Sequence, residues 1–488
     1  MIDGTALTCA QVTGIARHDA QVEVDPAGLE RAHAAWEAVG RIARRRPVYG
    51  RTTGVGANRH VVIDGDEDEA GHGLRLLRSH AGGAGPLLNR ELARAALIVR
   101  LNQFAAGGSG VNPDLLGILA RALNAGLSPA IPSYGAIGTG DLTALASTAL
   151  CILGERPWRG GVDLPPYRLS SADALAFISS NAATLGEAAI ACHELRDLLD
   201  AAVVVAGLSF TVVHGSDEPY GVPVHEARPH PGQRAAAALM RTLLADEPIT
   251  PARIQDPYGY RALPQVHGPA MDAAGQLERV LTIEMNAASE NPLVDVAGDD
   301  VWHNGNFHTV GAGLALDASR VALFQTAALT AARLGTLMEP SFTGLRPFLA
   351  DGPESSSGVM ILEYATHAAI ADIRRHAAPA ALGTAVLSRG LEEHAGFSTQ
   401  SARASTDAAA AYRVVVACEL VAAVRALRMR GAPPKGEALR TAYDRVAAAL
   451  DPNTADRPLD ADIATAESLL PELAGLASGG SLSQTWPS

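Results

Sequence analysis

Basic residues are scarce in this sequence, and lysine is almost absent. The 488 residues include 39 Lys and Arg against 52 Asp and Glu, which gives a formal net charge of -13 at pH 7. A chain without a basic stripe cannot release the counterions of a nucleic acid, so we expect no nucleic-acid partner. Schiff-base chemistry has a single candidate, Lys435, and its Pro-rich loop does not favour that role.

Cysteine is also sparse, and no hydrophobic run is long enough to span a membrane. The four cysteines lie far apart, with no CxxC pair and no histidine at metal-ligand spacing. This usage is typical of a reduced, cytoplasmic protein, and it predicts no metal site. The N-terminal residues lack the features of a signal peptide. The longest apolar runs, 142–154 and 201–213, fall short of the ~20 residues that a membrane span needs, so we expect a soluble protein with no membrane partner.

Aromatic residues make up only 4% of the chain, although 48% of it is hydrophobic. Ala, Leu and Val supply most of the apolar content, a mixture that favours close-packed helices over a β-sandwich. The chain is also too long for one typical core. We therefore expect a mainly α protein with an N-terminal domain at 1–200, a central long-helix bundle at 201–430 and a C-terminal helical segment at 431–488.

Hydrophobic periodicity locates the helices. Four Ala/Leu-rich segments exceed the usual length of a globular helix, and such helices bury their apolar stripes best against one another. They predict the central bundle, with loops at 255–268, 290–308 and 344–358 at the helix ends. The expected helices are 26–45, 74–80, 89–105, 114–125 and one from 142, and the four long ones are 184–205, 268–288, 314–337 and 404–429.

Three glycines precede a predicted helix in GAIGTGDL, residues 135–142. Glycines at this place free the backbone for tight turns and expose amide donors, so the segment alone is compatible with an anion-binding turn. It lacks the order of a P-loop, and no clear strand precedes it for a dinucleotide fingerprint. We therefore expect no nucleotide cofactor.

Together with the preceding PAIPSY, this segment resembles the loop in which aromatic amino acid ammonia-lyases and aminomutases cyclise an internal Ala-Ser-Gly into a methylidene-imidazolone. Further stretches resemble motifs of the same family in the same order, from about residue 49 to 398. The resemblance implies a long helical bundle of the fumarase and histidine ammonia-lyase type. The stretches are VYGRTTGVG (48–56), LLRSHAGGAG (76–85) with RLNQFAAGGSGV after it, QDPYGYRALPQVHG (255–268), NAASENPLVD (286–295), NGNFH (304–308) and GLEEHAGFS (390–398).

The resemblance gives Tyr49 the role of general base, on a lid loop, in removing the β-proton of an amino acid. It gives Arg261 the role of binding the substrate carboxylate through its planar fork, with Asn306 beside it. The alternative for Tyr49 is an ordinary loop tyrosine.

Other residues would surround the electrophile. By the same resemblance, Tyr258 and Gln265 would line the electrophile and the amino group, and Phe307 would pack against the electrophile loop. The family also implies a homotetramer in which loops of three subunits form each active site. In that assembly Tyr49 and Tyr258 of one pocket would come from different chains.

Two residues bear on selectivity. His80, in the pair Ser79-His80 that differs with substrate in the family, and the acid Glu392 resemble the histidine-acting enzymes. A histidine and a carboxylate can each hydrogen-bond a ring N–H or hydroxyl, so they suit an imidazole or another polar ring. The alternative is structural, with His80 capping a helix and Glu392 salt-bridged to an arginine.

The loop departs from the family at the electrophile itself. Gly138-Thr139-Gly140, followed by Asp141, stands where the family has Ala-Ser-Gly and an aspartate. Ring closure needs the Gly140 nitrogen to attack the Gly138 carbonyl, and loss of water from Thr139 leaves an ethylidene in place of a methylidene. The added methyl crowds the carbon that the substrate amine must attack, and the β-branch stiffens the loop.

A second departure lies in ALAFISSNAATLG. Ser179-Ser180 stands where the family's Asn-Gly touches the electrophile, and Asn181 follows as a candidate replacement. Glu290 replaces the usual aspartate before Asn291-Pro292, which is a milder change.

Three interpretations of the function stay open. The first is a lyase or aminomutase for an aromatic or imidazole-bearing α-amino acid, with a self-formed imidazolone from Gly138-Thr139-Gly140 and with Tyr49 as the base. The second keeps the pocket without the electrophile and uses Tyr49 and Tyr258 for another elimination, addition or cyclisation. The third is a catalytically silent tetrameric binding protein, which the intact tyrosines and Arg261 disfavour.

Overall fold

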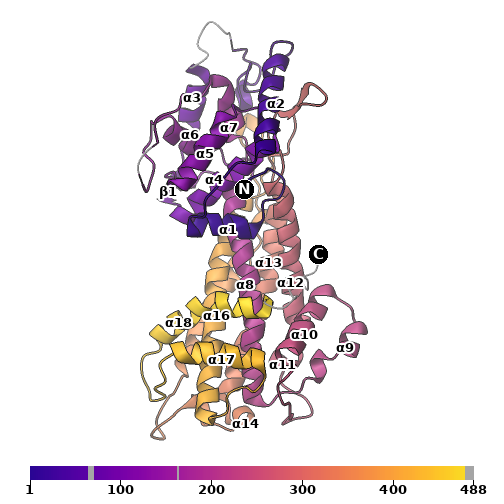
Figure 1. The fold of residues 1–488 in the computed structure, drawn as a ribbon, viewed down its shortest axis with the longest axis vertical. Coiled ribbons are helices and arrows are strands. Elements are labelled where there is room, and N and C mark those ends of the chain that lie inside the picture. Colours follow the sequence, from indigo (N-terminus) through magenta and orange to yellow (C-terminus); the bar gives the residue numbers. More distant parts are fainter. Residues whose placement is uncertain (64–70, 162–163, 479–488) are drawn as a thin grey trace. The chain divides into compact units, whose positions relative to one another are not determined.

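Helices form most of the computed structural model, which describes residues 1–63, 71–161 and 164–478 (Figure 1). The expectation of a mainly α protein is confirmed. The described strands pair antiparallel as two small sheets, β1 (Ala84–Leu87) with β2 (Pro132–Tyr134) and β3 (Leu293–Asp295) with β4 (Asp300–Trp302).

The chain packs as two compact units, and each unit combines three separate stretches of sequence. Unit 1 is Met1–His193, Leu277–Asp317 and Pro379–Thr406, and unit 2 is Glu194–Gln276, Ala318–Ala378 and Asp407–Ser488. The division of the sequence near residues 200 and 430 stays a prediction.

Local sequence signals set the helix ends in unit 1. The Asn89 side chain accepts a hydrogen bond from the Leu92 amide where α4 begins, and Gly107 ends that helix with φ +92°. The buried core gathers apolar side chains of α1, α4, α5 and α6. The elements wholly inside this unit, besides the strands, are α1 (Cys9–His18), α2 (Pro26–Ile42), η1 (Gly56–Asn58), α3 (Gly71–His80), α4 (Arg90–Ala106), α5 (Asp114–Asn124), α6 (Leu142–Ile152), η2 (Ser171–Asp173), α7 (Ala174–Ile178), η5 (Ala380–Leu382) and η6 (Ser388–Gly390).

Four long helices contribute residues to both units. They are α8 (Ala182–Val213), α12 (Leu263–Met285), α13 (Val310–Met338) and α16 (Ser398–Arg430), and they correspond to the four long segments expected from the sequence. Each begins earlier than expected. The first turn contains proline in α12, is polar in α16 and has two glycines in α13, so none of these three continues the apolar period to the helix start. Within unit 2 these helices run side by side and share one buried core, so the predicted bundle is present (Figure 1).

Unit 2 is completed by shorter helices around that bundle. An ion pair crosses its core, where Arg333 Nε lies 2.7 Å from Glu419 Oε1 and both side chains are buried. The elements wholly inside this unit are η3 (Glu218–Tyr220), α9 (Val222–Glu226), α10 (Pro231–Leu243), α11 (Tyr258–Arg261), α14 (Pro340–Thr343), η4 (Pro347–Leu349), α15 (Ile361–His376), α17 (Glu437–Ala449) and α18 (Asp460–Ser478).

Helix α13 is unusually apolar. Of the helices in the described ranges, it alone is long and apolar enough to cross a membrane by length and composition. Its most apolar window has a mean hydropathy of 1.3 and is 56% buried inside the protein. Asp317, Arg320 and Arg333 also lie buried along it, as in a core helix of a folded domain.

Candidate active site

A cavity of about 780 Å³ opens in unit 1 between the lid loop and the electrophile loop. Of the residues that the sequence singled out, Tyr49, His80, Thr139, Gly140, Phe307 and Glu392 line it. The other lining residues are Pro47, Thr53, Val55, Gly56, Ala57, Asn58, Arg59, His60, Leu142, Leu175, Ile178, Ser179, Asn291, His303, Ser388 and Leu391.

Tyr49 is held from both ends. Its hydroxyl oxygen accepts a hydrogen bond from the Gly56 amide of the same loop at 2.6 Å. Its own amide donates to Nε2 of His303 at 3.2 Å, and the two rings meet edge to face with centroids 6.5 Å apart. The next residue, Gly50, has φ +69°, and an added Cβ there would lie 2.0 Å from a Leu175 methyl. The backbone is thus folded tightly enough to present the phenol to the cavity.

Hydrogen bonds hold the electrophile loop at both glycines. The Gly138 carbonyl accepts from the Thr309 amide at 3.2 Å and from the Thr309 hydroxyl at 3.3 Å. The Gly140 amide donates to Asn181 Oδ1 at 2.9 Å, and Asn181 Nδ2 donates to the Phe307 carbonyl. Gly138 and Gly140 have φ +86° and +114°, a region that disfavours residues with a Cβ. Thr139 stands between them on the cavity wall.

Asp141 ties this loop to α6 and α8. Its carboxylate accepts from the Thr184 amide at 2.7 Å and from the Thr184 hydroxyl at 2.8 Å. Its own amide donates to the Ser180 carbonyl at 2.7 Å. Burial raises the pKa of Asp141 to about 6, and the Thr184 hydrogen bonds act in the opposite direction. The side chain is fully buried, so we interpret it as a support of the loop and not as a group that meets substrate.

His80 presents a hydrogen-bond acceptor to the cavity. Its Nδ1 lies 2.9 Å from the Leu76 carbonyl and 3.0 Å from Ser79 Oγ. Because a carbonyl can only accept, we assign the proton to Nδ1, and in the neutral ring Nε2 is then an acceptor. His80 therefore caps the last turn of α3 and lines the cavity at the same time. Glu392 lines the same cavity, and no ion pair of its carboxylate occurs among the described residues. The backbone amide and carbonyl of Glu392 are both hydrogen-bonded to Leu387, which fixes the position of this residue.

Seven of the predicted site residues are not among those that line this cavity. Gly138, Asp141 and Asn181 form or hold the electrophile loop, and the other four lie elsewhere. Tyr258, Arg261 and Gln265 belong to unit 2. There the Arg261 guanidinium stacks 4.4 Å from the Tyr258 ring centroid, and its Nε donates to the Asp256 carbonyl at 3.1 Å. Tyr258 is 65% exposed. Asn306 is exposed in unit 1, and its backbone amide donates to Asn304 Oδ1 at 2.7 Å.

Comparison with known proteins matches this geometry to one family. The aromatic amino acid lyase family pattern covers residues 7–448. The chain belongs to the aromatic amino acid lyase family. A histidine ammonia-lyase from Stigmatella aurantiaca is 33% identical over 488 residues, with 96% of each chain covered. Membership makes this protein a carbon–nitrogen lyase or an aminomutase.

Solved structures agree in fold over nearly the whole chain. The tyrosine aminomutase of Streptomyces globisporus has a TM-score of 0.90 at 28% identity, covering 97% of this chain and 96% of its own. The ergothioneine-degrading enzyme ergothionase of Treponema denticola has a TM-score of 0.87 at 26% identity, covering 97% of this chain and 99% of its own.

The electrophile loop fits the imidazolone that the family forms from its own chain. Two glycines with positive φ flank Thr139, and hydrogen bonds hold the carbonyl and the amide that ring closure would join. Thr139 carries the hydroxyl that dehydration needs. No cluster of three or more His, Cys, Asp or Glu side chains suited to a metal ion occurs in the described ranges.

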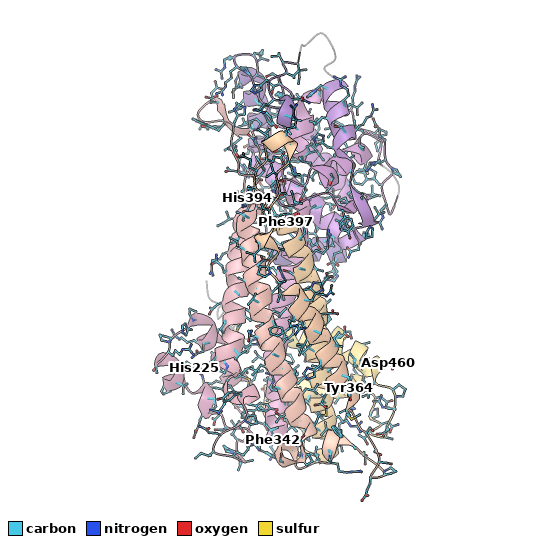
Figure 2. All side chains as sticks on the ribbon, turned by 180° about the vertical axis from the view of Figure 1, so that it is seen from behind. His225, Phe342, Tyr364, His394, Phe397 and Asp460 are labelled. Carbon is cyan, nitrogen blue, oxygen red and sulfur yellow. The ribbon has the colours of Figure 1, made fainter. Side chains whose placement is uncertain are left out.

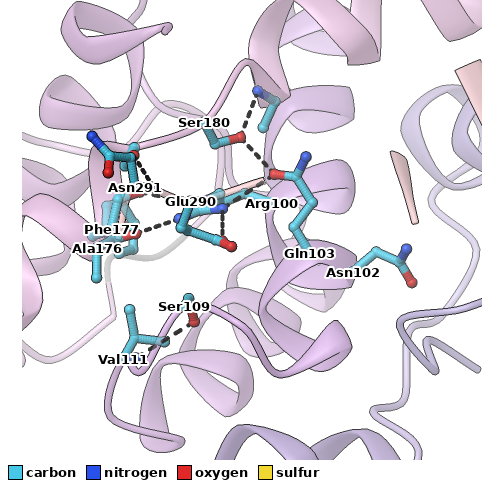
Figure 3. Close-up of polar contacts among 12 residues, drawn as sticks. Arg100, Asn102, Gln103, Ser109, Val111, Ala176, Phe177, Ser180, Glu290 and Asn291 are labelled. Carbon is cyan, nitrogen blue, oxygen red and sulfur yellow. Dashed lines mark hydrogen bonds and ion pairs between the residues drawn. The ribbon is translucent and has the colours of Figure 1, made fainter. Parts of the chain in front are cut away.

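A buried ion pair between Arg100 and Glu290 holds the backbone next to this site. Arg100 of α4 lies 2.8 Å from Glu290 and donates to the Ala176 and Phe177 carbonyls at the end of α7 (Figure 3). It also donates to Gln103 Oε1 at 3.1 Å, which in turn accepts from the Ser180 hydroxyl at 2.5 Å (Figure 3). Burial raises the pKa of Glu290, and Arg100 opposes that shift. The pair fixes the segment that leads into Asn181.

Sequence reasoning missed residues whose importance depends on contacts far along the chain. His303 directly precedes the NGNFH motif, and its position there was the only signal of its contact with Tyr49. Thr309 directly follows the same motif, and Ser398 ends GLEEHAGFS. Arg59 and His60 of the lid loop line the cavity as exposed cationic or polar groups.

Proposed function

We propose that this enzyme eliminates ammonia from, or moves the amino group of, an α-amino acid whose ring carries a hydrogen-bond donor. One observation carries the proposal: His80 Nε2 and the Glu392 carboxylate are both acceptors on the wall that Tyr49 and Thr139 also line. An imidazole N–H or a phenol O–H satisfies such acceptors. A bare phenyl ring leaves them unpaired, which costs binding energy.

Residues of the chain itself transfer the proton and hold the electrophile loop. Tyr49 removes the β-proton, because its hydroxyl is anchored in the cavity by the Gly56 amide. Asn181 and Thr309 hold the electrophile loop, and Phe307 closes the cavity beside it. An imidazolone formed from Gly138-Thr139-Gly140 supplies the electrophile that turns the substrate amine into a leaving group.

The assembly is proposed to be a cytoplasmic homotetramer that completes each site. In it, Tyr258, Arg261 and Gln265 of neighbouring subunits reach the cavity of unit 1, and Arg261 binds the substrate carboxylate. Large apolar side chains exposed on α12, α13 and α15 support such contacts between copies, because contact with another copy would remove them from water. They are Ile283 of α12, Leu314 and Val321 of α13, and Ile361 and Tyr364 of α15, of which Figure 2 labels Tyr364.

A second function is favoured by the same loop. Thr139 stands where the family has serine, and its added methyl crowds the carbon that the substrate amine would attack. The alternative is therefore an elimination, addition or cyclisation in which Tyr49 and Tyr258 act as acid and base without an imidazolone.

Turnover assays separate these functions. Histidine, tyrosine and phenylalanine are each incubated with the enzyme, and the unsaturated acid and the β-amino acid are quantified by chromatography. The proposal predicts product from histidine or tyrosine and a much lower kcat/KM for phenylalanine. Phenylalanine as the best substrate would contradict the role of the two acceptors. Binding without product from all three would contradict this proposal and leave the second function or a catalytically silent binding protein.

A further inference from the structure

Three consecutive carbonyls before Thr139 are each held by a donor. Gln400 Nε2 donates to the Ala136 carbonyl at 2.9 Å, and the Phe397 amide donates to the Ile137 carbonyl at 2.8 Å. The Gly138 carbonyl receives two donors from Thr309, at 3.2 Å and 3.3 Å. Phe397, labelled in Figure 2, directly precedes α16, and Gln400 lies in the first turn of that helix. The backbone that leads into the proposed ring is therefore held at three consecutive carbonyl oxygens.

The Thr309 hydroxyl, one of the two donors to the Gly138 carbonyl, also bonds to a second hydroxyl, and the two hydroxyls form a short relay. Thr309 Oγ1 lies 2.7 Å from Ser398 Oγ, and both residues are buried. A carbonyl can only accept, so the Thr309 hydroxyl points its hydrogen at Gly138 and accepts from the Ser398 hydroxyl. Hydrogen bonds in such a chain polarise one another. The relay therefore strengthens the hydrogen bond that the Thr309 hydroxyl donates to the Gly138 carbonyl oxygen.

Ser398 also explains the glycine at position 138. A Cβ built there would lie 2.5 Å from Ser398 Oγ and 2.9 Å from the Ser398 amide nitrogen. The φ of +86° disfavours alanine as well. The Ser398 hydroxyl thus occupies the space that an alanine methyl needs, and Gly138 and Ser398 depend on each other.

We propose that Thr309, supported by Ser398, is a positioning residue that activates the Gly138 carbonyl for cyclisation of the electrophile loop. This inference rests on the first proposed function. Donors aimed at a carbonyl oxygen stabilise the negative charge that develops when a nucleophile attacks its carbon.

The step balances without an oxidant or a co-reactant. The Gly140 nitrogen bonds to the Gly138 carbonyl carbon, and the amide proton passes to the carbonyl oxygen. That oxygen leaves as water with the amide hydrogen of Thr139, which makes a carbon–nitrogen double bond. The Thr139 hydroxyl then leaves as a second water with the α-hydrogen of the same residue.

The test follows dehydration by intact mass after synthesis of the full chain, independently of turnover. Thr309→Val removes the hydroxyl at nearly constant volume, and we expect dehydration on the order of 100-fold slower than in the native chain. Thr309→Ser keeps the hydroxyl and should dehydrate at the native rate. Thr336→Val is the matched control, because the Thr336 hydroxyl donates to the Ala332 carbonyl within unit 2 and the electrophile loop belongs to unit 1.

Each outcome decides something. A native chain that never loses water would overturn the first proposed function, and this inference with it. A native chain and Thr309→Val that lose two waters at equal rates would overturn the inference alone. Circular dichroism checks that each variant folds.

A second hydroxyl variant keeps the proposal testable if Thr309→Val fails to fold. Ser398→Ala removes the hydroxyl from which Thr309 accepts and leaves Thr309 in place, so dehydration should be slower than in the native chain. Equal dehydration rates of Ser398→Ala and the native chain would contradict the support of Thr309 by Ser398.

Discussion

Tyr49 shows how one residue can be prepared for proton transfer by its own loop. Its hydroxyl oxygen accepts a hydrogen bond from the Gly56 amide at 2.6 Å, and its backbone amide donates to Nε2 of His303. These contacts fix the phenol where it lines the cavity with Thr139. The hydroxyl is therefore positioned before substrate arrives, which is the geometric requirement of a general base.

Replacing Tyr49 by phenylalanine removes the hydroxyl of the proposed general base and keeps the aromatic ring. We expect Tyr49→Phe to lower kcat by about 10²- to 10⁴-fold, with substrate affinity little changed. Steady-state kinetics and equilibrium binding of substrate measure the two effects. Tyr443→Phe on α17 serves as the control and should retain native kcat. A Tyr49→Phe enzyme with native kcat would remove Tyr49 from the mechanism.

In the proposed function, His80 and Glu392 select the ring of the substrate. Glu392→Leu and His80→Leu should each lower kcat/KM for the ring-donor substrate by about 10- to 100-fold, because each removes an acceptor for the donor on the substrate ring. The value for phenylalanine should stay level or rise in His80→Leu. Equal losses for all three amino acids would indicate a structural role instead.

At the scale of an element, the lid loop is anchored by a neutral imidazole. Nε2 of His303 accepts the Tyr49 amide, so it cannot carry a proton. Partial burial and then Arg46 lower the pKa of His303, and Asp300 opposes them. Because the folded pKa is lowered, the anchor is intact at neutral pH and is lost only as the pH falls below the ordinary histidine value of about 6.5.

This anchor predicts an acid limb in the pH–activity profile. Activity of the native enzyme should fall as His303 takes up a proton, because a protonated Nε2 would repel the Tyr49 amide. His303→Gln can accept through its amide oxygen without titrating, so its profile should lack that limb. Measuring kcat/KM against pH with a tyrosine substrate avoids titration of a substrate imidazole. Superimposable profiles of the two enzymes would contradict the anchor.

The buried Arg100–Glu290 pair joins α4, the end of α7 and the loop after α12. Arg100→Leu leaves Glu290 charged and buried, so we expect a loss of about 3 to 5 kcal/mol in the free energy of unfolding. The surface change Arg17→Gln, at the Arg17–Glu91 pair, should cost less than about 1 kcal/mol. Denaturant unfolding measures both, and similar costs would refute the structural role of the buried pair.

The sequence predicts elements better than it predicts contacts between them. Apolar period and breakers locate α2, α4, α5 and the four long helices, because those signals are local. The family motifs identify Tyr49, Thr139 and Glu392 as candidates. The bond from Asn181 to Gly140 and the crowding of Gly138 by Ser398 join segments far apart in sequence, so no local pattern reveals them.

At the scale of the whole molecule, the central question is how unit 1 obtains a carboxylate-binding group. No unit 2 residue is among the described residues that line the cavity, and Arg261 belongs to unit 2. The proposed tetramer resolves this by lending Arg261 from another copy. Sedimentation should then give a tetramer, and a stable monomer would contradict the shared site.

Mixing two inactive variants tests sharing more directly. Tyr49→Phe and Arg261→Ala chains should each be inactive alone. If each site draws these residues from different chains, co-expressed or exchanged subunits should regain part of the native activity, because some mixed sites contain both native residues. Lack of any recovery in confirmed mixed assemblies would refute sharing of these two residues.

The intact mass of the denatured, desalted native chain tests the central claim most directly. A threonine-derived electrophile predicts a deficit of two waters, mapped by fragmentation to the peptide that contains Gly138-Thr139-Gly140. An unmodified mass in freshly purified protein would contradict that claim and leave cofactor-free acid–base chemistry by Tyr49 as the mechanism on this fold.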